Sequence, residues 1–252
     1  MTGSITRTVK SLAQKILIFI FWVALWWIIS LIVSEEILVP APDVTARALV
    51  SLLSEKEFYL SCLLSLLRVL AGFAAGVAIG FFGGIAASEN RLFDRLFSPV
   101  LRLMRAVPVA SFIILALVLI KTDMVPVFIS LLTVTPIVWS GSYAAMRGLD
   151  PNILEMAQVF KVPKSRVFFK IKLPGILPAS GAAAATALGF GWKSAVAAEV
   201  ICRPDYSLGD VLWSGKITLE TPKVFAVSAV IIILSLLFEK LLKFLLKKLP
   251  SA

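Results

Sequence analysis

The 252-residue chain is 59% hydrophobic and 16% charged, whereas soluble domains are about half apolar and a quarter charged. Its formal net charge of +10 does not indicate nucleic-acid binding, because the cations flank apolar runs and form no single stripe. No histidine is present, so a histidine-based active site is excluded, and no metal site is expected. Cys62 and Cys202 are expected to be free thiols, with a disulfide as the alternative if the outside is oxidising.

The apolar runs predict an all-α membrane protein with six transmembrane helices, and the whole chain, 1–252, is expected to form a single transmembrane domain. The first run is too long for the apolar core of a signal peptide and lacks a small-residue cleavage site, so we expect it to be retained. The third run is interrupted at Pro108, and the fourth contains Pro136. The predicted spans are residues 13–33, 60–87, 100–120, 125–146, 179–201 and 224–246.

Two polar intervals are longer than simple hairpins. In residues 34–59, Asp43 is the expected N-cap of an amphipathic helix, Val44–Leu53, that lies on the membrane surface. Residues 202–223 predict a short re-entrant or surface helix. The cation distribution puts both intervals outside and both termini in the cytoplasm, because most of the 25 Lys and Arg residues then flank the inner ends of the spans.

Glycines recur every fourth residue along the second span, at Gly72, Gly76, Gly80 and Gly84. Small residues on one helical face let two backbones approach closely. Two interpretations stay open. The stripe forms either a tight helix contact inside the subunit, or a subunit interface or gate.

Lys193 lies near the middle of the fifth span, where a charge costs several kcal/mol unless it is paired or hydrated. Glu199 follows on a different face of the same helix, because successive residues are rotated by about 100°. Either each of them pairs with an opposite charge on another helix, or Lys193 faces a water-filled path and attracts an anion. The break after Arg105, at Pro108, likewise either lines such a path or packs against protein.

The polar interval from Glu155 to Pro178 keeps an amphipathic rhythm in which apolar side chains alternate with lysines and one arginine. It predicts a short helix, a turn at Val162-Pro163 and a second helix that ends at Leu173-Pro174. Phe160, Val167 and Phe168 are expected to contact another protein, and Glu155 to cap or orient the first turn. Such a shaped surface is more than a connection between two spans requires.

This interval resembles the EAA loop of ABC importer permeases, E-A-A-x-x-x-G followed by I-x-L-P. Glu155, Ala157 and 171–174 match in register, while Met156 replaces an alanine and Lys161 replaces the glycine. The resemblance implies a cytoplasmic coupling loop at about 150–178. The residues that it assigns to ATPase coupling are Glu155, Ala157, Phe160, Lys161, Ile171, Leu173 and Pro174.

Motifs along nearly the whole chain resemble the nitrate/sulfonate/taurine branch of these permeases. They are Val39-Pro40-Ala41-Pro42, Leu66-Leu67-Arg68, Arg105-Ala106-Val107-Pro108, Gly191-Trp192 and Ala197-Ala198-Glu199. The resemblance implies a type I ABC importer permease fold in a bacterial plasma membrane. It further implies a second permease subunit as a homodimer partner, two cytoplasmic ATPase subunits and an external solute-binding protein that docks on residues 43–53 and 202–223.

By the same resemblance, this chain is not an enzyme and holds no cofactor, since ATP and Mg belong to the ATPase, and no GxxxxGK[ST] motif occurs here. The solute is expected to be a small molecule, with an anion such as a sulfonate or nitrate as one candidate. The alternative function is an ion-coupled secondary transporter. The residues expected to line the translocation path are Arg105, Pro108, Trp192, Lys193, Ser194 and Glu199.

Overall fold

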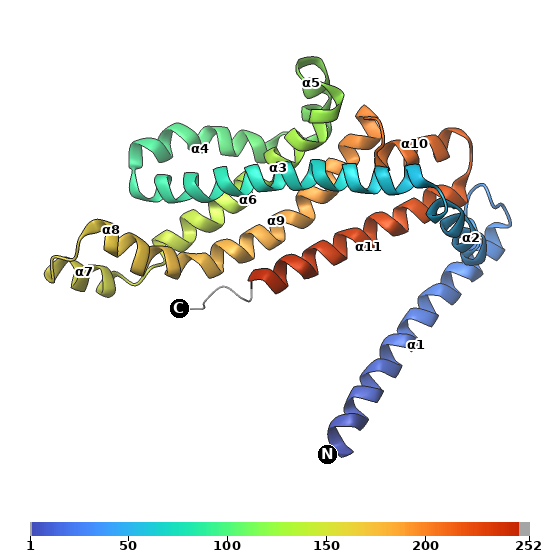
Figure 1. Ribbon diagram of the computed structural model, residues 1–252, viewed down its shortest axis with the longest axis horizontal. Helices are drawn as coiled ribbons and strands as arrows, with labels where there is room; N and C mark the ends of the chain where they lie inside the picture. Colours follow the sequence, from blue (N-terminus) through green and yellow to red (C-terminus); the bar gives the residue numbers. More distant parts are fainter. Residues whose placement is uncertain (1, 247–252) are drawn as a thin grey trace. The chain divides into compact units, whose positions relative to one another are not determined.

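The computed structural model describes residues 2–246, with side chains from residue 14 onward except at Leu245, and this part of the chain is helical without strands. Five helices are long and apolar enough to cross a membrane, and a bent pair would make a sixth (Figure 1). The predicted all-α class is therefore confirmed. The elements are α1 (Thr2–Val33), α2 (Pro42–Leu53), α3 (Lys56–Glu89), α4 (Arg91–Ala106), α5 (Val109–Leu119), η1 (Thr122–Met124), α6 (Val125–Arg147), α7 (Pro151–Val159), α8 (Lys164–Val167), the π-helix η2 (Phe168–Lys172), α9 (Leu173–Cys202), α10 (Leu208–Ile217) and α11 (Thr221–Leu246).

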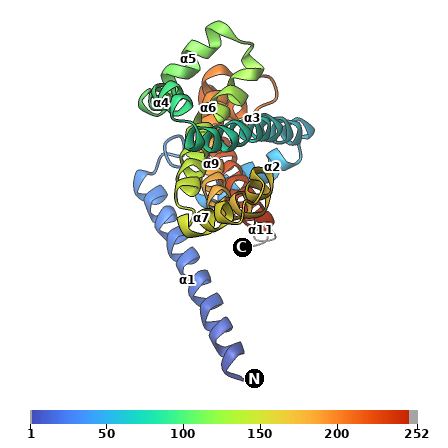
Figure 2. The same cartoon turned by 90° about the vertical axis from the view of Figure 1, so that its left-hand side faces the viewer.

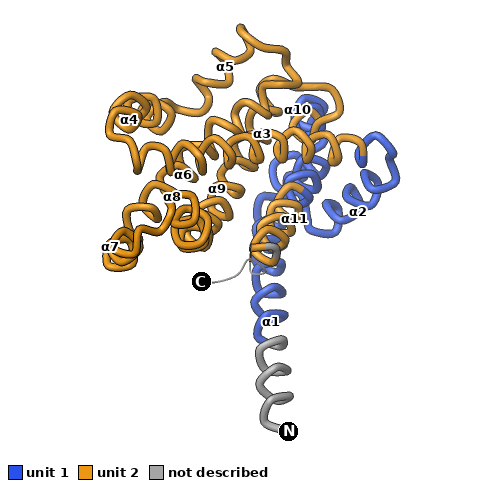
Figure 3. Tube along the Cα trace, turned by 60° about the vertical axis from the view of Figure 1, so that its left-hand side comes forward, with its two compact units in different colours: residues 1–59, 211–230 blue, residues 60–210, 231–252 orange. Residues whose placement is uncertain are grey.

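The chain divides into two compact units, residues 1–59 with 211–230, and residues 60–210 with 231–252 (Figure 3). In the first unit, the segment between α1 and α2 is held by hydrogen bonds from side chains. Trp26 Nε1 donates to the Pro40 carbonyl at 3.1 Å, and Thr221 Oγ1 donates to the Ile37 carbonyl at 2.6 Å. The ring of Trp26 also stacks on Phe225, with centroids 5.9 Å apart. These contacts order a segment that carries no regular structure of its own.

The helix expected after residue 40 is present as α2, but its predicted cap is wrong. The helix begins at Pro42, and Ala41 is the N-cap without a side-chain hydrogen bond. Proline is well suited to the first turn, because its fixed φ is helical and its missing N–H has no partner there anyway. Asp43 therefore lies inside the first turn, where it pairs with Arg47 at 2.9 Å. The short helix expected in 202–223 is confirmed as α10.

In the second unit, the glycine stripe of α3 packs tightly on α6. A Cβ atom added to Gly72 would lie 2.2 Å from the Val127 carbonyl oxygen, and one added to Gly84 would lie 2.5 Å from the Trp139 carbonyl oxygen. Only glycine permits this backbone approach. Of the two interpretations of the stripe, the contact inside the subunit is confirmed.

The third predicted span differs most from its prediction. The chain forms α4, which Asn90 caps by accepting from two amides, and then α5, with a bend of 106° between them (Figures 1 and 2). The break at Pro108 is confirmed, but the helix before it begins at Arg91 and not near residue 100. A search for apolar runs misses the start of α4 because this helix is strongly amphipathic, with arginines along one side. α5 has 11 residues, about 16 Å, which is too short to span a ~30 Å hydrocarbon core alone.

Candidate functional site: the loop between α6 and α9 and the polar clusters of the second unit

The loop after α6 begins with a capped helix, α7. Asp150 Oδ1 accepts a 2.9 Å hydrogen bond from the amide of Asn152, and Pro151 occupies the first turn. The expectation that Glu155 caps or orients this turn is wrong, because the helix begins at Pro151 and Glu155 lies exposed in the second turn.

α7 ends in a Schellman motif. The Lys161 amide donates to the Gln158 carbonyl and the Val162 amide donates to the Ala157 carbonyl, both at 2.9 Å. This geometry holds Lys161 in the left-handed region, with φ of 49°. Glycine adopts that conformation freely, whereas another L-residue is strained by roughly 1–2 kcal/mol. The glycine of the EAA pattern thus corresponds to a real backbone requirement. The predicted turn at Val162-Pro163 is confirmed in spite of the lysine.

Beyond the turn, the chain is continuously helical, which corrects the prediction that the second helix ends at Leu173-Pro174. α8 passes into the π-helix η2, and η2 leads directly into α9. Within an α-helix, a proline ring clashes with the carbonyl four residues earlier. In η2 the Leu173 amide bonds instead to the Phe168 carbonyl, five residues back. This change of register just before Pro174 accommodates the proline ring.

The outer side of α7 is apolar and exposed. Met156, Val159 and Phe160 are 56%, 78% and 74% exposed, and Ile153, one turn earlier, is 43% exposed. Ala157, by contrast, is buried. A contiguous apolar surface on an otherwise charged loop is typical of a protein-contact site.

The inner side of the loop packs onto the ends of the spans in the same unit. Phe168 contacts the cluster of Ile85, Met146 and Ile176, so it belongs to the core and not to the exposed contact surface that the sequence predicts. The other loop residues of the EAA pattern lie at this inner side and are half-buried: Ile171, Leu173 and Pro174.

An ion pair ties the loop to the end of α3, because Lys172 Nζ lies 2.6 Å from Glu89 Oε1. The sequence gives no signal of this pair, because Lys172 and Glu89 belong to separate polar intervals. Between the ends of α3 and α6 and the loop lies a cleft of about 1000 Å³, whose lining includes Gln158, Val162 and Ser165.

On α9 the predicted path residues face different surroundings. Lys193 is exposed, and it forms no ion pair with any residue in the described range 2–246. Ser194 is half-buried, whereas Trp192 is 2% exposed and stacks on Phe238 with ring centroids 5.8 Å apart. Of these three neighbours, Lys193 alone presents its side chain to the outside of the subunit.

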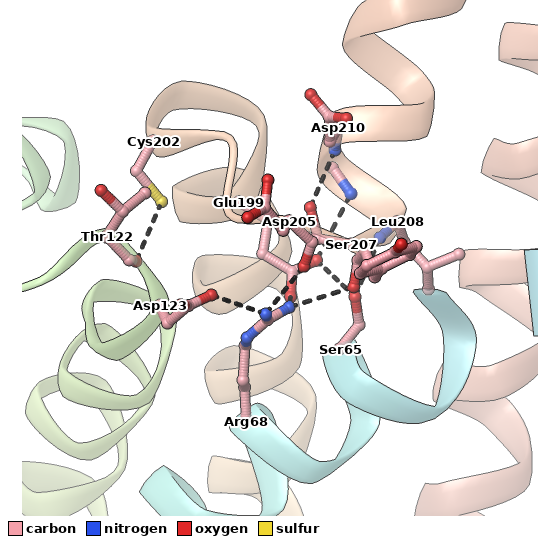
Figure 4. A network of polar contacts seen from close by, with 12 residues as sticks. Ser65, Arg68, Thr122, Asp123, Glu199, Cys202, Asp205, Ser207, Leu208 and Asp210 are labelled. Carbon is pink, nitrogen blue, oxygen red and sulfur yellow. Dashed lines mark hydrogen bonds and ion pairs between the residues drawn. The ribbon is translucent and has the colours of Figure 1, made fainter. Parts of the chain in front are cut away.

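Glu199 is fully buried and lies in a polar network (Figure 4). Its Oε2 accepts hydrogen bonds from Ser65 Oγ at 2.7 Å and from the Gly209 amide at 3.3 Å. The Ser65 hydroxyl in turn accepts from the Leu208 amide at 2.9 Å. Arg68 Nη1 lies 3.8 Å from Glu199 Oε1. Of the open interpretations, pairing with a charge on another helix therefore describes Glu199.

Arg68 connects this buried carboxylate to two further segments. Its Nη2 donates to Asp123 Oδ1 at 2.8 Å and to the Asp205 carbonyl at 2.9 Å, and its Nη1 donates to the Tyr206 carbonyl at 3.2 Å (Figure 4). The sequence places Arg68 in one of the matching motifs but gives it no partner. The two charges of two distant motifs, Leu66-Leu67-Arg68 and Ala197-Ala198-Glu199, meet here.

Arg105, at the end of α4, contacts the proline kink of α6. Its Nη2 donates to the Pro136 carbonyl at 3.0 Å and to Ser140 Oγ. Pro108 is the exposed N-cap of α5 at the bend. Cys62 and Cys202 are free, as expected.

Several known proteins resemble this chain over most of its length. It is 26% identical to a probable ABC transporter permease protein of Brucella melitensis over 92% of this chain and 94% of that protein. It is 24% identical to the bicarbonate transport system permease protein CmpB of Synechococcus elongatus, over 63% of this chain and 58% of CmpB. The nitrate import permease protein NrtB of Synechocystis is 23% identical, over 76% of this chain and 70% of NrtB.

The fold is also that of a solved importer. The inward-facing MetNI methionine ABC transporter matches with a TM-score of 0.61 at 14% identity, over 76% of this chain and 94% of the matched chain. Residues 76–250 match a family described as binding-protein-dependent transport system inner membrane component. The chain belongs to this family of ABC importer permeases.

Proposed function

We propose that this permease subunit pairs with a second copy of itself and couples to two separate ATPase subunits through the outer face of α7. The carrying observation is the exposed apolar surface of Met156, Val159 and Phe160 on a loop that is otherwise cationic. The hydrogen-bonded Schellman turn and the Lys172–Glu89 pair hold the loop against the ends of the spans, so that force on α7 reaches α3 and α6. In this proposal both termini and the loop face the cytoplasm, and ATP and Mg bind only to the ATPase.

Reconstitution tests this assembly. The permease is co-expressed with a candidate ATPase subunit, the complex is purified and its mass is measured, and the complex is then placed in proteoliposomes. We expect two permease chains with two ATPase chains, and solute uptake that requires ATP. A complex with one permease chain that transports at the full rate would contradict the homodimer. Uptake driven by an ion gradient without ATP would contradict coupling, and would favour the secondary transporter that family membership argues against.

We further propose that the solute is a small anion, that Lys193 faces its path and that an external binding protein delivers it. The named relatives carry bicarbonate and nitrate, two small oxyanions. Lys193 supports the same class, because a cation near the middle of a span is costly unless it meets water or an anion. Competition in the uptake assay with bicarbonate, nitrate and methanesulfonate, against glucose and methionine as uncharged and zwitterionic controls, tests the solute class.

A further inference from the structure

A second cationic surface lies apart from Lys193, in a cleft between α4 and α6. The cleft has a volume of about 410 Å³, and α4 contributes Asp94, Ser98, Leu101, Arg102 and Arg105 to it. From α6 come Trp139, Ser140 and Tyr143. Both arginines are exposed into this space, one helical turn apart.

Arg105 is held in place and still has donors to spare. Its Nη2 is occupied by the Pro136 carbonyl and the Ser140 hydroxyl, which fixes the plane of the guanidinium group. Its Nε and Nη1 groups donate to no acceptor within the described part of the chain. The hydrogen atoms on Nε and Nη1 do not lie on a common edge of the guanidinium group, so Arg105 offers each of them as a single charged donor to an oxyanion.

Arg102 adds a second open donor set. Its Nε makes one long contact of 3.4 Å to the Ser98 carbonyl, and its two Nη groups have no acceptor among residues 2–246. Tyr143 contributes an aromatic wall and a hydroxyl, and the Arg147 guanidinium carbon lies over that ring, 5.9 Å from its centroid.

The cleft also contains one acid, Asp94, whose Oδ1 accepts a 3.0 Å hydrogen bond from Ser98 Oγ. Two arginines against this single carboxylate leave the lining cationic. The indole ring of Trp139, which stacks on Phe93, closes one wall and lowers the local polarity, so that a charge in the cleft interacts more strongly than in bulk water.

We propose that Arg102 and Arg105 form an oxyanion-binding site through which the solute passes between the membrane path and the ATPase side. This inference rests on the proposed function, because it takes the solute to be an anion. Ser140 and Tyr143 lie in the last two turns of α6, which leads through Asp150 into α7. Movement of α7 with the ATPase would therefore shift one wall of the site against the other, which is fixed on α4.

The same two arginines would also suit an anionic lipid headgroup, and the test distinguishes the transported anion from such a lipid. The assembled transporter is placed in nanodiscs of phosphatidylcholine, in chloride buffer, and labelled with phenylglyoxal, which modifies arginine side chains. Peptide mass spectrometry follows Arg102 and Arg105, with the exposed Arg91 and Arg95 of the same helix as internal controls. Nitrate, bicarbonate and methanesulfonate are the probes, and phosphatidylglycerol is added to the nanodiscs in a separate arm.

With the anion at about ten times its Kd, labelling of Arg102 and Arg105 should slow roughly tenfold, while labelling of Arg91 and Arg95 stays unchanged. Equal protection of all four arginines, or protection of none, would overturn the site. Protection by phosphatidylglycerol alone would overturn its assignment to the solute. Labelling needs neither ATP nor a variant, so it tests the cleft separately from transport. If the transporter still imports anions with ATP but the cleft is not protected, this inference is refuted and the proposed function is not.

Discussion

Arg68 of α3 and Glu199 of α9 form a buried ion pair across two helices, with Nη1 3.8 Å from Oε1. Glu199 is 0% exposed, and the Arg68 side chain is 12% exposed. Glu199 Oε1 has no hydrogen-bond partner within the described residues, and Arg68 is the cation that pairs with it. The pair joins α3 to α9, and through Asp123 and the Asp205 and Tyr206 carbonyls it joins them to the neighbouring loops.

Removing one partner of this pair should be strongly destabilising. Arg68→Gln leaves a carboxylate buried without its cation, which typically costs roughly 3–5 kcal/mol. We expect a lower unfolding temperature and a lower yield of assembled transporter, measured by fluorescence-detected thermal unfolding and size exclusion. Adding Glu199→Gln to that variant should restore part of the loss.

The control for this prediction is Arg47→Gln. Arg47 pairs with Asp43 in an exposed pair on α2, and such pairs contribute little. Equal stability of Arg68→Gln and the wild type would contradict the structural role of the buried pair.

Gly209 should tolerate no side chain, because it lies directly against the backbone of α9. A Cβ atom there would be 2.4 Å from the Glu199 carbonyl carbon, closer than real contacts allow. Gly209→Ala should therefore lower the unfolding temperature and displace the amide that bonds to Glu199. Gly189→Ala is the matched control, since nothing lies within 4 Å of its Cβ position. In a helix interior this change should stabilise by up to ~1 kcal/mol. The reverse order of the two variants would refute the packing described here.

The sequence allowed the spans and the helix–turn–helix character of the loop to be predicted, because long apolar runs and a Val-Pro turn are local signals. The Arg68–Glu199 pair could not be found in this way. Its partners lie on separate spans, and a single sequence carries no information on which faces of two helices meet. Hydropathy likewise hid the start of α4 at Arg91, since its arginines interrupt the apolar run.

The continuation of the loop into α9 shows a different limit. Pro174 predicts the end of a helix, because a proline inside a helix removes a backbone hydrogen bond and clashes with the preceding turn. A π-helix over residues 168–172 relieves the clash of the proline ring with the preceding turn. The residue types in this segment do not predict a π-helix. Of the predicted path residues, Lys193 lies exposed while Glu199 is buried, a distinction that depends on tertiary packing.

Lys161→Gly should rigidify the turn at the end of α7. The substitution relieves roughly 1–2 kcal/mol of left-handed strain, partly offset by the greater freedom of glycine in the unfolded chain. A net gain of ~1 kcal/mol corresponds to roughly fivefold slower hydrogen exchange at the amides of residues 161 and 162, whose bonds close the turn. Lys161→Ala, which removes the same charge but keeps a Cβ atom, should show no such slowing. Equal exchange in both variants would argue against strain at this position.

Phe160→Asp should weaken binding of the ATPase, because a charge replaces one of the most exposed apolar side chains of α7. We expect a loss in affinity of at least roughly tenfold, ~1.4 kcal/mol, with the permease still inserted and folded. Biolayer interferometry of the ATPase on immobilised permease measures this change. Gln158→Asp, on the cleft side of the same helix, introduces the same charge and should bind nearly as the wild type does. Unchanged ATPase affinity in Phe160→Asp would contradict α7 as the docking helix.

Glu155→Lys should also abolish transport-coupled ATP hydrolysis. Unchanged coupling in Glu155→Lys would likewise contradict α7 as the docking helix.

Lys193→Met should reduce anion uptake without loss of stability. Methionine keeps much of the bulk and removes the charge, and Lys193 has no ion pair within residues 2–246 that the change would break. A hydrogen bond to a charged group contributes about 1.5–3 kcal/mol, so the rate at low solute concentration should fall roughly tenfold or more. Lys216→Met on α10, where the ammonium lies 4.8 Å from the Trp213 ring centroid, is the control and should transport normally. If Lys193 instead pairs with an acid of the second subunit, the variant should assemble poorly, because that acid would be left buried and uncompensated. Normal uptake by Lys193→Met in a fully assembled transporter would exclude both roles.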